Sequence, residues 1–381
     1  MPGDIYEQLL HIPQAHLVEL ALAGLSRQGE LLAKAVEHIQ AQLDAVVGAA
    51  SARRIYLAGC GDSYFAALSA RFPFEQLTGL PTVALESMEF ARYTLLPPDS
   101  LVFVISSGGE VSMTLEAGRV ARQAGVDVVG VTTQKASHMA QEFPCLTTIP
   151  DISSTGDADQ VALILGNFSF SLAVLYLAAL HIGHVRGHLD DRMAGQLEAE
   201  IRAAPAAVER AISCSTQIHA YLESVSNEAD FYFLGAGPSY GVALFYQAKF
   251  FEQAQRPVYG VELEEFTHEQ FFLLRPGQDT QVWFIVPPGC GRERALEVMA
   301  GCQEIGAHVI AVTSSQGSQI QEKADLTFPV AATSEMFSPL VSVVPGELLG
   351  IHAFGRWGGG PSFASKRRRQ MAISKRLTRE G

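Results

Sequence analysis

The chain has 381 residues, of which 48% are hydrophobic and 18% charged, and its formal net charge is −13. This length and apolar content indicate two or three globular units with buried cores and exclude a mainly disordered or low-complexity protein. The acidic balance disfavours nucleic-acid binding, and five scattered cysteines without CxxC spacing disfavour a disulfide scaffold or a zinc ribbon. We therefore expect a cytoplasmic protein that binds no nucleic acid.

Residues 1–50 are expected to form an N-terminal helical segment, because apolar side chains recur there at helical spacing. These side chains are Leu17, Leu20, Leu25, Leu31, Leu32 and Ala35. The chain opens Met-Pro-Gly-Asp-Ile-Tyr-Glu, without the basic stretch and apolar stretch of a secretory signal.

Residues 51–190 are expected to form a first α/β domain, in which short apolar runs alternate with helical stretches. The strand-sized runs are residues 54–58, 81–85, 101–105 and 126–131, and the helical stretches are 64–78 and 110–124. Short apolar strands separated by helices predict a parallel sheet with helices on both faces, which is a doubly wound, flavodoxin-like α/β fold.

An uncharged run of 23 residues, 161–183, is long enough to cross a bilayer. It contains the polar residues Asn167, Ser169, Ser171 and His181, and no basic anchor precedes it. A helix buried in a large α/β protein has the same composition. We therefore expect a core or subunit-interface helix and no membrane partner.

Three histidines at the end of this run, His181, His184 and His188, raise the alternative of a metal site. No cysteine or carboxylate stands at a fixed spacing from them, so we expect no metal. Residues 191–224 are then expected to form a helical connector, and residues 225–335 a second α/β domain.

The two α/β domains are related by an internal repeat. The segment IYLAGCGDSYFAALSA, from Ile55, parallels FYFLGAGPSYGVALFY, from Phe231, at an offset of 176 residues. The same offset carries Glu86 onto Glu262, whereas AGVDVVGVTT parallels IGAHVIAVTS at an offset of 181. One offset kept over about 30 residues predicts two duplicated halves.

Small hydroxyl residues and glycines stand where two strands of the first half end. Ligands bind beyond the carboxyl ends of parallel strands, and exposed N–H groups ahead of a helix suit a phosphate. The alternative is that these residues only cap helices and form turns. The candidate phosphate-binding residues are Cys60, Gly61, Asp62, Ser63, Ser106, Ser107, Gly108 and Gly109.

The second half differs at the second of these loops. At the offset of 181, Ser106-Ser107-Gly108 faces Pro287-Pro288-Gly289, which has neither the hydroxyls nor, at the prolines, the amide donors. We therefore expect the first half to hold a phosphate. A dinucleotide site is the alternative, because both halves carry GxGxS and Glu86 stands where a ribose-binding acid is found, although the third glycine is missing.

Charged residues of the second half suit acid–base chemistry. Lys249 and Glu252 are three residues apart on one predicted helix and share a face. The residues Glu262, Glu264, Glu265 and His268 crowd the end of the following strand, so that a carboxylate and an imidazole come within reach of one substrate. The alternatives are a solvated ion pair and a surface acidic patch.

Residues 336–381 are expected to form a C-terminal helix and a basic tail. The stretch from Gly355, GRWGGGPSFASKRRRQ, is rich in Gly and Pro and then basic, which predicts a flexible crossing segment. Seven basic residues against Glu380 give the last sixteen residues a net charge of +6 and leave −19 on the rest. A tail that covers an anionic substrate fits this asymmetry better than a nucleic-acid contact.

The duplicated α/β halves, the CGDS and SSGGE loops and the EF-x-H stretch resemble the sugar isomerase (SIS) domain proteins. The pattern is similar to the tandem isomerase half of glucosamine-6-phosphate synthase and to fructosamine-6-phosphate deglycases, and it covers roughly residues 20–380. The resemblance implies a sugar phosphate as ligand, no cofactor, and a homodimer with shared active sites.

The resemblance also implies roles for single residues. Ser63, Ser106 and Ser107 fall where the family's loops grip the phosphate. Lys249 and Glu252 match the family's K-x-x-E helix, whose glutamate moves a proton between C1 and C2. His268 matches a histidine implicated in ring opening and often donated by a neighbouring subunit, and Lys375 resembles the lysine of the family's C-terminal tail.

Several positions depart from the family pattern. Gly108 and Val111 replace hydroxyl residues of the S-x-S-G-x-T phosphate loop, and Asp62 replaces a common Thr. Leu163-Ile164 stands in place of Ser-Thr, and Glu269-Gln270 in place of Gly-Pro. These changes leave phosphate affinity and substrate identity open. No upstream glutaminase segment with a cysteine after Met1 is present, so we do not expect an ammonia-channelling amidotransferase.

Together these features predict a phosphosugar enzyme that acts at C1/C2 of a ketose or amino-sugar 6-phosphate. Aldose–ketose isomerisation, glucosamine-6-phosphate deamination and fructosamine-6-phosphate deglycation share one proton transfer, so the site residues do not separate them. The alternative from another class is a phosphosugar-sensing module without turnover.

Overall fold

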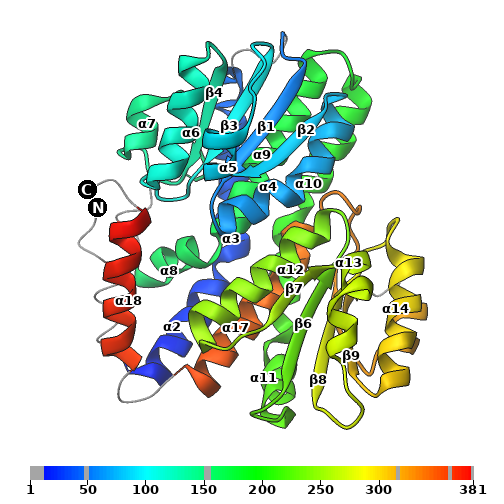
Figure 1. Cartoon of the computed structure of the whole chain (residues 1–381). Helices are drawn as coiled ribbons and strands as arrows, with labels where there is room; N and C mark the ends of the chain where they lie inside the picture. Colours follow the sequence, from blue (N-terminus) through cyan, green and yellow to red (C-terminus); the bar gives the residue numbers. More distant parts are fainter. Residues whose placement is uncertain (1–12, 47–50, 150–155, 315–317, 359–362, 379–381) are drawn as a thin grey trace. The chain divides into compact units, whose positions relative to one another are not determined.

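The computed structural model describes residues 13–46, 51–149, 156–314, 318–358 and 363–378. The chain divides into two compact units, of which unit 1 comprises Met1–Arg202 and Gly359–Gly381 and unit 2 comprises Ala203–Gly358. Each unit contains one five-stranded parallel sheet with helices on both faces (Figure 1).

The sheet of unit 1 has the strand order β2-β1-β3-β4-β5, and every neighbouring pair is parallel. This is the doubly wound, flavodoxin-like order that the alternation of apolar runs predicts. The strands are β1 (Arg54–Gly59), β2 (Thr82–Glu86), β3 (Ser100–Ile105), β4 (Asp127–Thr132) and β5 (Cys145–Thr147).

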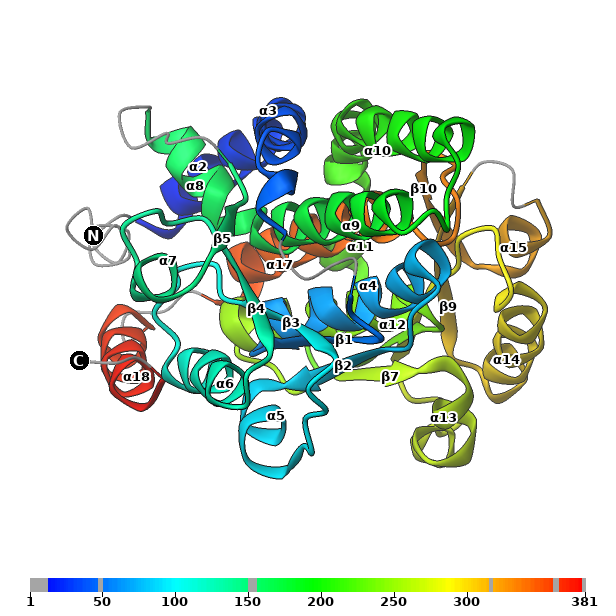
Figure 2. The same cartoon turned by 90° about the horizontal axis from the view of Figure 1, so that it is seen from above.

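Helices cover both faces of this sheet (Figure 2). One face packs against α4 (Asp62–Thr78) and α9 (Asn167–Val185), and the other against α5 (Ser87–Tyr93) and α6 (Ser112–Gln123). The core of the second face joins side chains of β1, β3 and β4 to those of α5 and α6. Besides α18, described below, the other described helices of unit 1 are α2 (Gln14–Ser26), α3 (Gln28–Gln40), η1 (Leu43–Ala45), α7 (His138–Glu142), α8 (Asp157–Leu165) and most of α10 (Asp191–Ala211).

The long uncharged run forms two helices rather than the single one expected. Gly166 separates α8 from α9, and a Cβ on Gly166 would lie 2.7 Å from the ring of Phe170. Helix α9 is long and apolar enough to cross a membrane, but 83% of its most apolar stretch is buried, against α4 and α3 among others. Its hydrophobicity is therefore that of a core helix, as expected.

The expectation of a flexible tail is wrong for residues 363–378, which form the helix α18 (Phe363–Thr378). No Gly or Pro interrupts this stretch, and Ala, Lys, Arg, Gln and Met favour helices. The Ser112 hydroxyl, at the start of α6, donates to the Thr378 carbonyl at the end of α18, 3.3 Å away.

The sheet of unit 2 has the strand order β7-β6-β8-β9-β10, which repeats the order of unit 1 strand by strand. The internal duplication predicted from the sequence is therefore confirmed at the level of topology. The strands are β6 (Asp230–Gly235), β7 (Tyr259–Glu262), β8 (Thr280–Ile285), β9 (His308–Ser314) and β10 (Leu326–Val330).

Helices cover both faces of this sheet as well. On one face lie α12 (Pro238–Lys249) and α17 (Val344–Trp357), and on the other α13 (Leu263–His268) and α14 (Arg292–Ile305), whose apolar side chains share a core with β6, β8 and β9. The remaining helices are η2 (Ile212–Cys214), α11 (Ser215–Ser224), η3 (Phe250–Ala254), η4 (Gln270–Leu273), α15 (Ser318–Lys323) and α16 (Pro339–Ser342).

Strand pairing corrects the alignment of the second loop by one residue. Gly59 pairs with Ile105 in unit 1, and Gly235 pairs with Ile285 in unit 2. The offset at the end of β3 and β8 is therefore 180, so that Ser106 corresponds to Val286 and Gly109 to Gly289. The offset of 181 holds only from β9 onward. The second loop still lacks both serines and carries two prolines.

Candidate functional site

The strand order of unit 1 places two loops side by side at the carboxyl edge of the sheet. β2 lies on one side of β1 and β3 on the other, so the helices that follow β1 and β3 leave in opposite directions. Such a switch point is where flavodoxin-like sheets bind ligands. The loops that start at the paired residues Gly59 and Ile105 are the two predicted phosphate loops.

The first loop is shaped by its two glycines. A Cβ on Gly59 would lie 2.9 Å from the backbone of Ser63, so the close turn from β1 into α4 requires glycine there. Gly61 has φ +55, and a Cβ on it would meet no heavy atom within 4 Å, so it faces open space. Asp62 is the first residue of α4, where the helix dipole stabilises a negative charge.

Cys60 belongs to a polar cluster beneath this loop. Its thiol donates to Glu86 Oε1 at 3.0 Å and lies 3.7 Å from the Thr114 hydroxyl, which in turn bonds Ser87. Burial raises the pKa of the Cys60 thiol, so the thiol stays protonated and acts as a donor. Cys60 therefore supports the loop rather than serving as a nucleophile.

The carboxylate of Glu86 is used within the protein. Its Oε2 accepts the amides of Met88 and Glu89 and so caps α5, while Oε1 accepts the Cys60 thiol. Glu262 caps α13 in the same way in unit 2. This capping role accounts for the position of Glu86 without the ribose contact of the dinucleotide alternative.

The second loop is closed by its own hydrogen bonds. The Ser106 side chain is buried, and its Oγ accepts the Gly109 amide at 3.1 Å. Gly109 has φ +67, and a Cβ there would lie 2.2 Å from the Ser137 hydroxyl, so the turn requires glycine. Gly108 faces open space, with no heavy atom within 4 Å of a Cβ. The surface offered to a ligand is therefore at Ser107 and Gly108, with Ser106 beneath it.

Asn167 contacts the second loop, although the sequence did not indicate it as a candidate site residue. The Ser107 hydroxyl donates to Asn167 Oδ1 at 2.6 Å. Asn167 is the first residue of α9, about 60 positions further along the chain. No local motif marks this contact, because it depends on where Gly166 ends one helix and starts the next.

In unit 2, Lys249 and Glu252 form an ion pair of 2.8 Å where α12 ends. The Lys249 side chain is 11% exposed and its ammonium lies 4.7 Å from the ring centroid of Phe245, whereas the Glu252 side chain is 49% exposed. The turn that carries Glu252, Phe250–Ala254, is π-helical, a distortion that is frequent at functional sites. A buried cation thus orients a carboxylate that reaches solvent.

Two glycines of α17 bring that helix close to this pair. A Cβ on Gly350 would lie 2.9 Å from Lys249 Cβ and from Gln253 Oε1, and one on Gly346 would lie 2.1 Å from the ring of Tyr246. The backbone of α17 therefore packs directly against α12 and supports the side chain of Lys249.

The carboxylates predicted to crowd around His268 bind different partners. Glu262 caps α13, while Glu264 binds Arg294 at 2.6 Å and His268 at 3.2 Å. Hydrogen bonds from Arg294 lower the pKa of the Glu264 carboxyl. The His268 side chain is 66% exposed on the short helix α13, and Glu264 is its bonded carboxylate.

The other predicted site residues lie elsewhere. Lys375 is on α18 in unit 1, with a partly buried side chain. The three histidines considered as metal ligands take different surroundings: His184 bonds Asp191, His188 bonds the Gln76 carbonyl, and burial lowers the pKa of His181. The structure thus brings together the two loops of unit 1 and, separately, Lys249 and Glu252 of unit 2.

Known proteins share both the sequence pattern and the fold. The isomerizing glutamine–fructose-6-phosphate aminotransferase of Tropheryma whipplei (strain TW08/27) is 28% identical over 356 residues, 92% of this chain and 55% of that protein. That of Gloeobacter violaceus is 28% identical over 316 residues, 81% of this chain and 50% of that protein. The chain spans about half the length of these curated relatives.

Solved structures share the fold at lower identity. The C-terminal domain of glucosamine-fructose-6-phosphate aminotransferase from Francisella tularensis has a TM-score of 0.77 at 19% identity, over 89% of this chain and 96% of that one. Glucosamine-6-phosphate deaminase from Thermotoga maritima has a TM-score of 0.66 at 21% identity, over 90% and 96%. Tagatose-6-phosphate ketose/aldose isomerase from Escherichia coli has a TM-score of 0.69 at 15% identity, over 90% and 94%.

The SIS domain family model matches residues 49–180 and 224–355, one match for each half of the repeat. The two matches contain the two parallel sheets, from β1 to β5 and from β6 to β10. The chain therefore belongs to the SIS domain family and carries two SIS domains in tandem.

Proposed function

We propose that the chain is an enzyme of the phosphosugar isomerase and deaminase type, acting at C1/C2 of a ketose or amino-sugar 6-phosphate. The observation that carries the proposal is the Lys249–Glu252 pair, because a buried ammonium holds a solvent-reaching carboxylate in place on a π-helical turn. The family supports a sugar phosphate as ligand, and the relatives and neighbours include an aminotransferase, a deaminase and an isomerase named for such sugars.

In this proposal each predicted residue has one task. The loops around Ser63 and Ser107 bind the phosphate of the substrate, and His268 opens the sugar ring. Glu252 then moves a proton between C1 and C2 through an enediol or enolamine. Lys249 or Lys375 stabilises the oxyanion that develops at the carbonyl. We further propose that the protein is a cytoplasmic homodimer, in which each subunit donates His268 to the active site of the other.

The experiment is exchange of the substrate's C2 proton with solvent deuterium, measured by NMR for wild type and Glu252→Gln. We expect the variant to lose exchange at least about 100-fold, because general acid–base catalysis contributes about that much or more. Glu223→Gln removes the same charge from an exposed position on α11 and is expected to keep wild-type exchange.

The second candidate function is a phosphosugar sensor without turnover. It is favoured by the second loop, in which Gly108 and Val111 stand in place of hydroxyl residues. Equally slow exchange by wild type and Glu252→Gln, together with unchanged sugar-phosphate binding, would establish the sensor and contradict the enzyme.

A further inference from the structure

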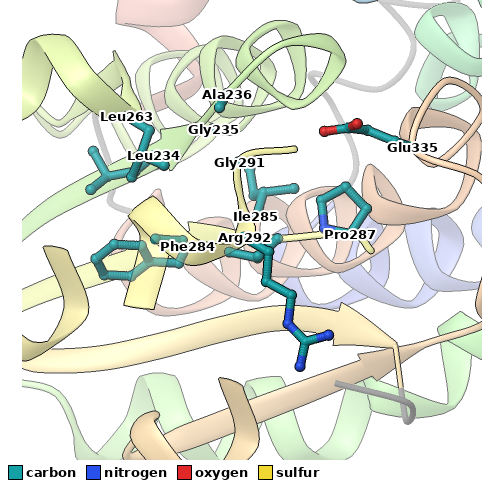
Figure 3. A pocket seen from close by; sticks show the side chains of 12 residues that line it. Leu234, Gly235, Ala236, Leu263, Phe284, Ile285, Pro287, Gly291, Arg292 and Glu335 are labelled. Atoms are coloured by element: carbon teal, nitrogen blue, oxygen red, sulfur yellow. The ribbon is translucent and has the colours of Figure 1, made fainter. Parts of the chain in front are cut away.

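The carboxyl edge of the sheet in unit 2 holds a small pocket at the position that corresponds to the loops of unit 1 (Figure 3). It lies between the ends of β6 and β8, the switch point of this sheet. Its free volume is about 10 Å³, which holds no more than one water molecule. Its lining includes Gly291, Arg292 and Glu335.

The carboxylate of Glu335 occupies this position. The Cys290 amide donates to Glu335 Oε2 at 3.1 Å, although the two residues are 45 positions apart. A Cβ on Gly289 would lie between 2.2 and 2.5 Å from the three atoms of the carboxylate, so the loop approaches the group closely. Figure 3 shows the carboxylate turned toward the stretch of chain that carries Gly291.

The surroundings favour a negative group here. Helix α14 begins at this edge, after Gly291, which has no side chain to cap the first amides of the helix. Helix α12 also begins here, but its first residue, Pro238, has no N–H, and the Ser239 and Tyr240 amides donate to the Ala236 and Gly237 carbonyls. The N-terminal ends of helices carry unpaired N–H groups and a partial positive charge. Arg292, the first residue of α14, lines the pocket, but its guanidinium is turned away from the Glu335 carboxylate (Figure 3).

We propose that this edge of unit 2 is a second oxyanion-binding site and that Glu335 is its built-in occupant. The ligand class is a small oxyanion, carboxylate or phosphate, bound by the Cys290 amide just ahead of the first turn of α14. Cys290 corresponds to Glu110 of the second loop in unit 1. Both loops would thus bind an anion: the loop of unit 1 the phosphate of a substrate, and the loop of unit 2 the Glu335 carboxylate. The proposal concerns unit 2 alone and holds whether or not the chain turns over a sugar phosphate.

Chemical rescue tests the proposal. Glu335→Ala empties the position, and we expect formate or inorganic phosphate to raise its melting temperature by about 2 °C at a tenfold excess over the dissociation constant. Wild type, whose position is filled, is expected to gain nothing from formate beyond the effect of equal ionic strength in chloride. Rescue by formate alone identifies a carboxylate site, and rescue by both anions a general oxyanion site.

Glu293→Ala is the matched control, because Glu293 is an exposed carboxylate in the first turn of the same helix α14. Equal responses of Glu335→Ala and Glu293→Ala to formate and phosphate would overturn the proposal. Phosphate bound in unit 1 would stabilise Glu335→Ala and Glu293→Ala equally. It therefore cannot produce the expected result, which is a larger stabilisation of Glu335→Ala.

Gly289→Ala gives an independent test of where the carboxylate sits. In wild type the new methyl group meets the Glu335 carboxylate, so we expect a lower melting temperature, whereas in Glu335→Ala the same change is expected to be nearly neutral. Additive effects would show that the carboxylate lies elsewhere and would overturn the proposal. If Glu335→Ala does not fold, Glu335→Gln takes its place, and a loss no greater than that of Glu293→Gln would count against the site.

Discussion

At the scale of single residues, the contact between Ser107 and Asn167 adds a polar side chain beside the second loop of unit 1. The loop carries Gly108 where the family pattern has a hydroxyl residue, and Gly108 faces open space. Asn167 accepts the Ser107 hydroxyl through Oδ1, which leaves its amide nitrogen as a donor on the same side chain. We infer that Asn167 contributes to phosphate binding beside Ser107.

Asn167→Ala is accordingly expected to weaken sugar-phosphate binding about 5–10-fold, the effect of one lost hydrogen bond. Asn167→Asp is expected to weaken it further, because a carboxylate then faces an anion. Isothermal titration with a sugar 6-phosphate measures both. Gln196→Ala, which removes an exposed amide on α10, is the control, and an affinity of Asn167→Ala equal to that of the control contradicts the assignment.

The residue scale is also where prediction from sequence was least complete. The sequence placed Ser106 and Ser107 together as phosphate ligands, but β3 ends at Ile105 and turns Ser106 inward, where it accepts the Gly109 amide. Which of two adjacent serines faces out depends on where a strand ends, and a hydropathy pattern does not fix that position. Asn167 was missed because its partner is distant in sequence.

At the scale of elements, helix α17 packs against the turn that carries the Lys249–Glu252 ion pair. Gly350→Ala is expected to displace Lys249 or α17, costing about 1–3 kcal/mol of unfolding free energy and lowering turnover, because the Cβ has no room beside Lys249 Cβ. Gly195→Ala, in α10, meets nothing within 4 Å and is expected to stabilise the chain by about 0.5–1 kcal/mol. Urea unfolding measures the change in unfolding free energy for both variants. Equal changes in Gly350→Ala and Gly195→Ala would contradict close packing at Gly350.

A second contact of α17 predicts a pH dependence of stability. His352 Nε2 bonds the Ser215 hydroxyl of α11 at 2.9 Å, and burial together with the nearby His219 lowers the pKa of His352 to about 4. Between pH 6.5 and 4 the unfolded chain therefore binds a proton that the folded chain does not, so stability falls as the pH falls.

The loss expected over that range is about 1 kcal/mol, after allowance for the partial exposure of the imidazole. Urea unfolding of wild type and His352→Gln at pH 7.5 and pH 4.5 measures it. We expect the pH-dependent loss to be smaller in the variant. An identical loss in both proteins would assign it to other groups.

Most elements followed from the sequence, and the exceptions have physical reasons. The apolar runs predicted four of the five strands of unit 1 within about one residue, because buried parallel strands are continuously apolar. The register of the second loop was misplaced by one residue, since β8 carries no motif that fixes its end. The helix α18 was missed because the glycines and prolines before it suggested that flexibility continues.

At the scale of the whole molecule, duplication accounts for the length and the topology of the chain. Both halves keep the strand order and the glutamate that caps the helix after the second strand, Glu86 and Glu262. They differ at the second loop, where unit 1 has serines and unit 2 has prolines and the carboxylate of Glu335. In our proposals one half therefore binds an external anion, while the other supplies its own carboxylate.

In our proposal the chain binds a sugar 6-phosphate. The measurement that tests it most directly is a thermal-shift panel with hexose, amino-hexose and fructosamine 6-phosphates, their unphosphorylated sugars and NAD(P)H. We expect at least one 6-phosphate, at 100 times its dissociation constant, to stabilise the chain by about 2.7 kcal/mol, with no effect of the free sugars or the nucleotide. Stabilisation by NAD(P)H alone would contradict the account.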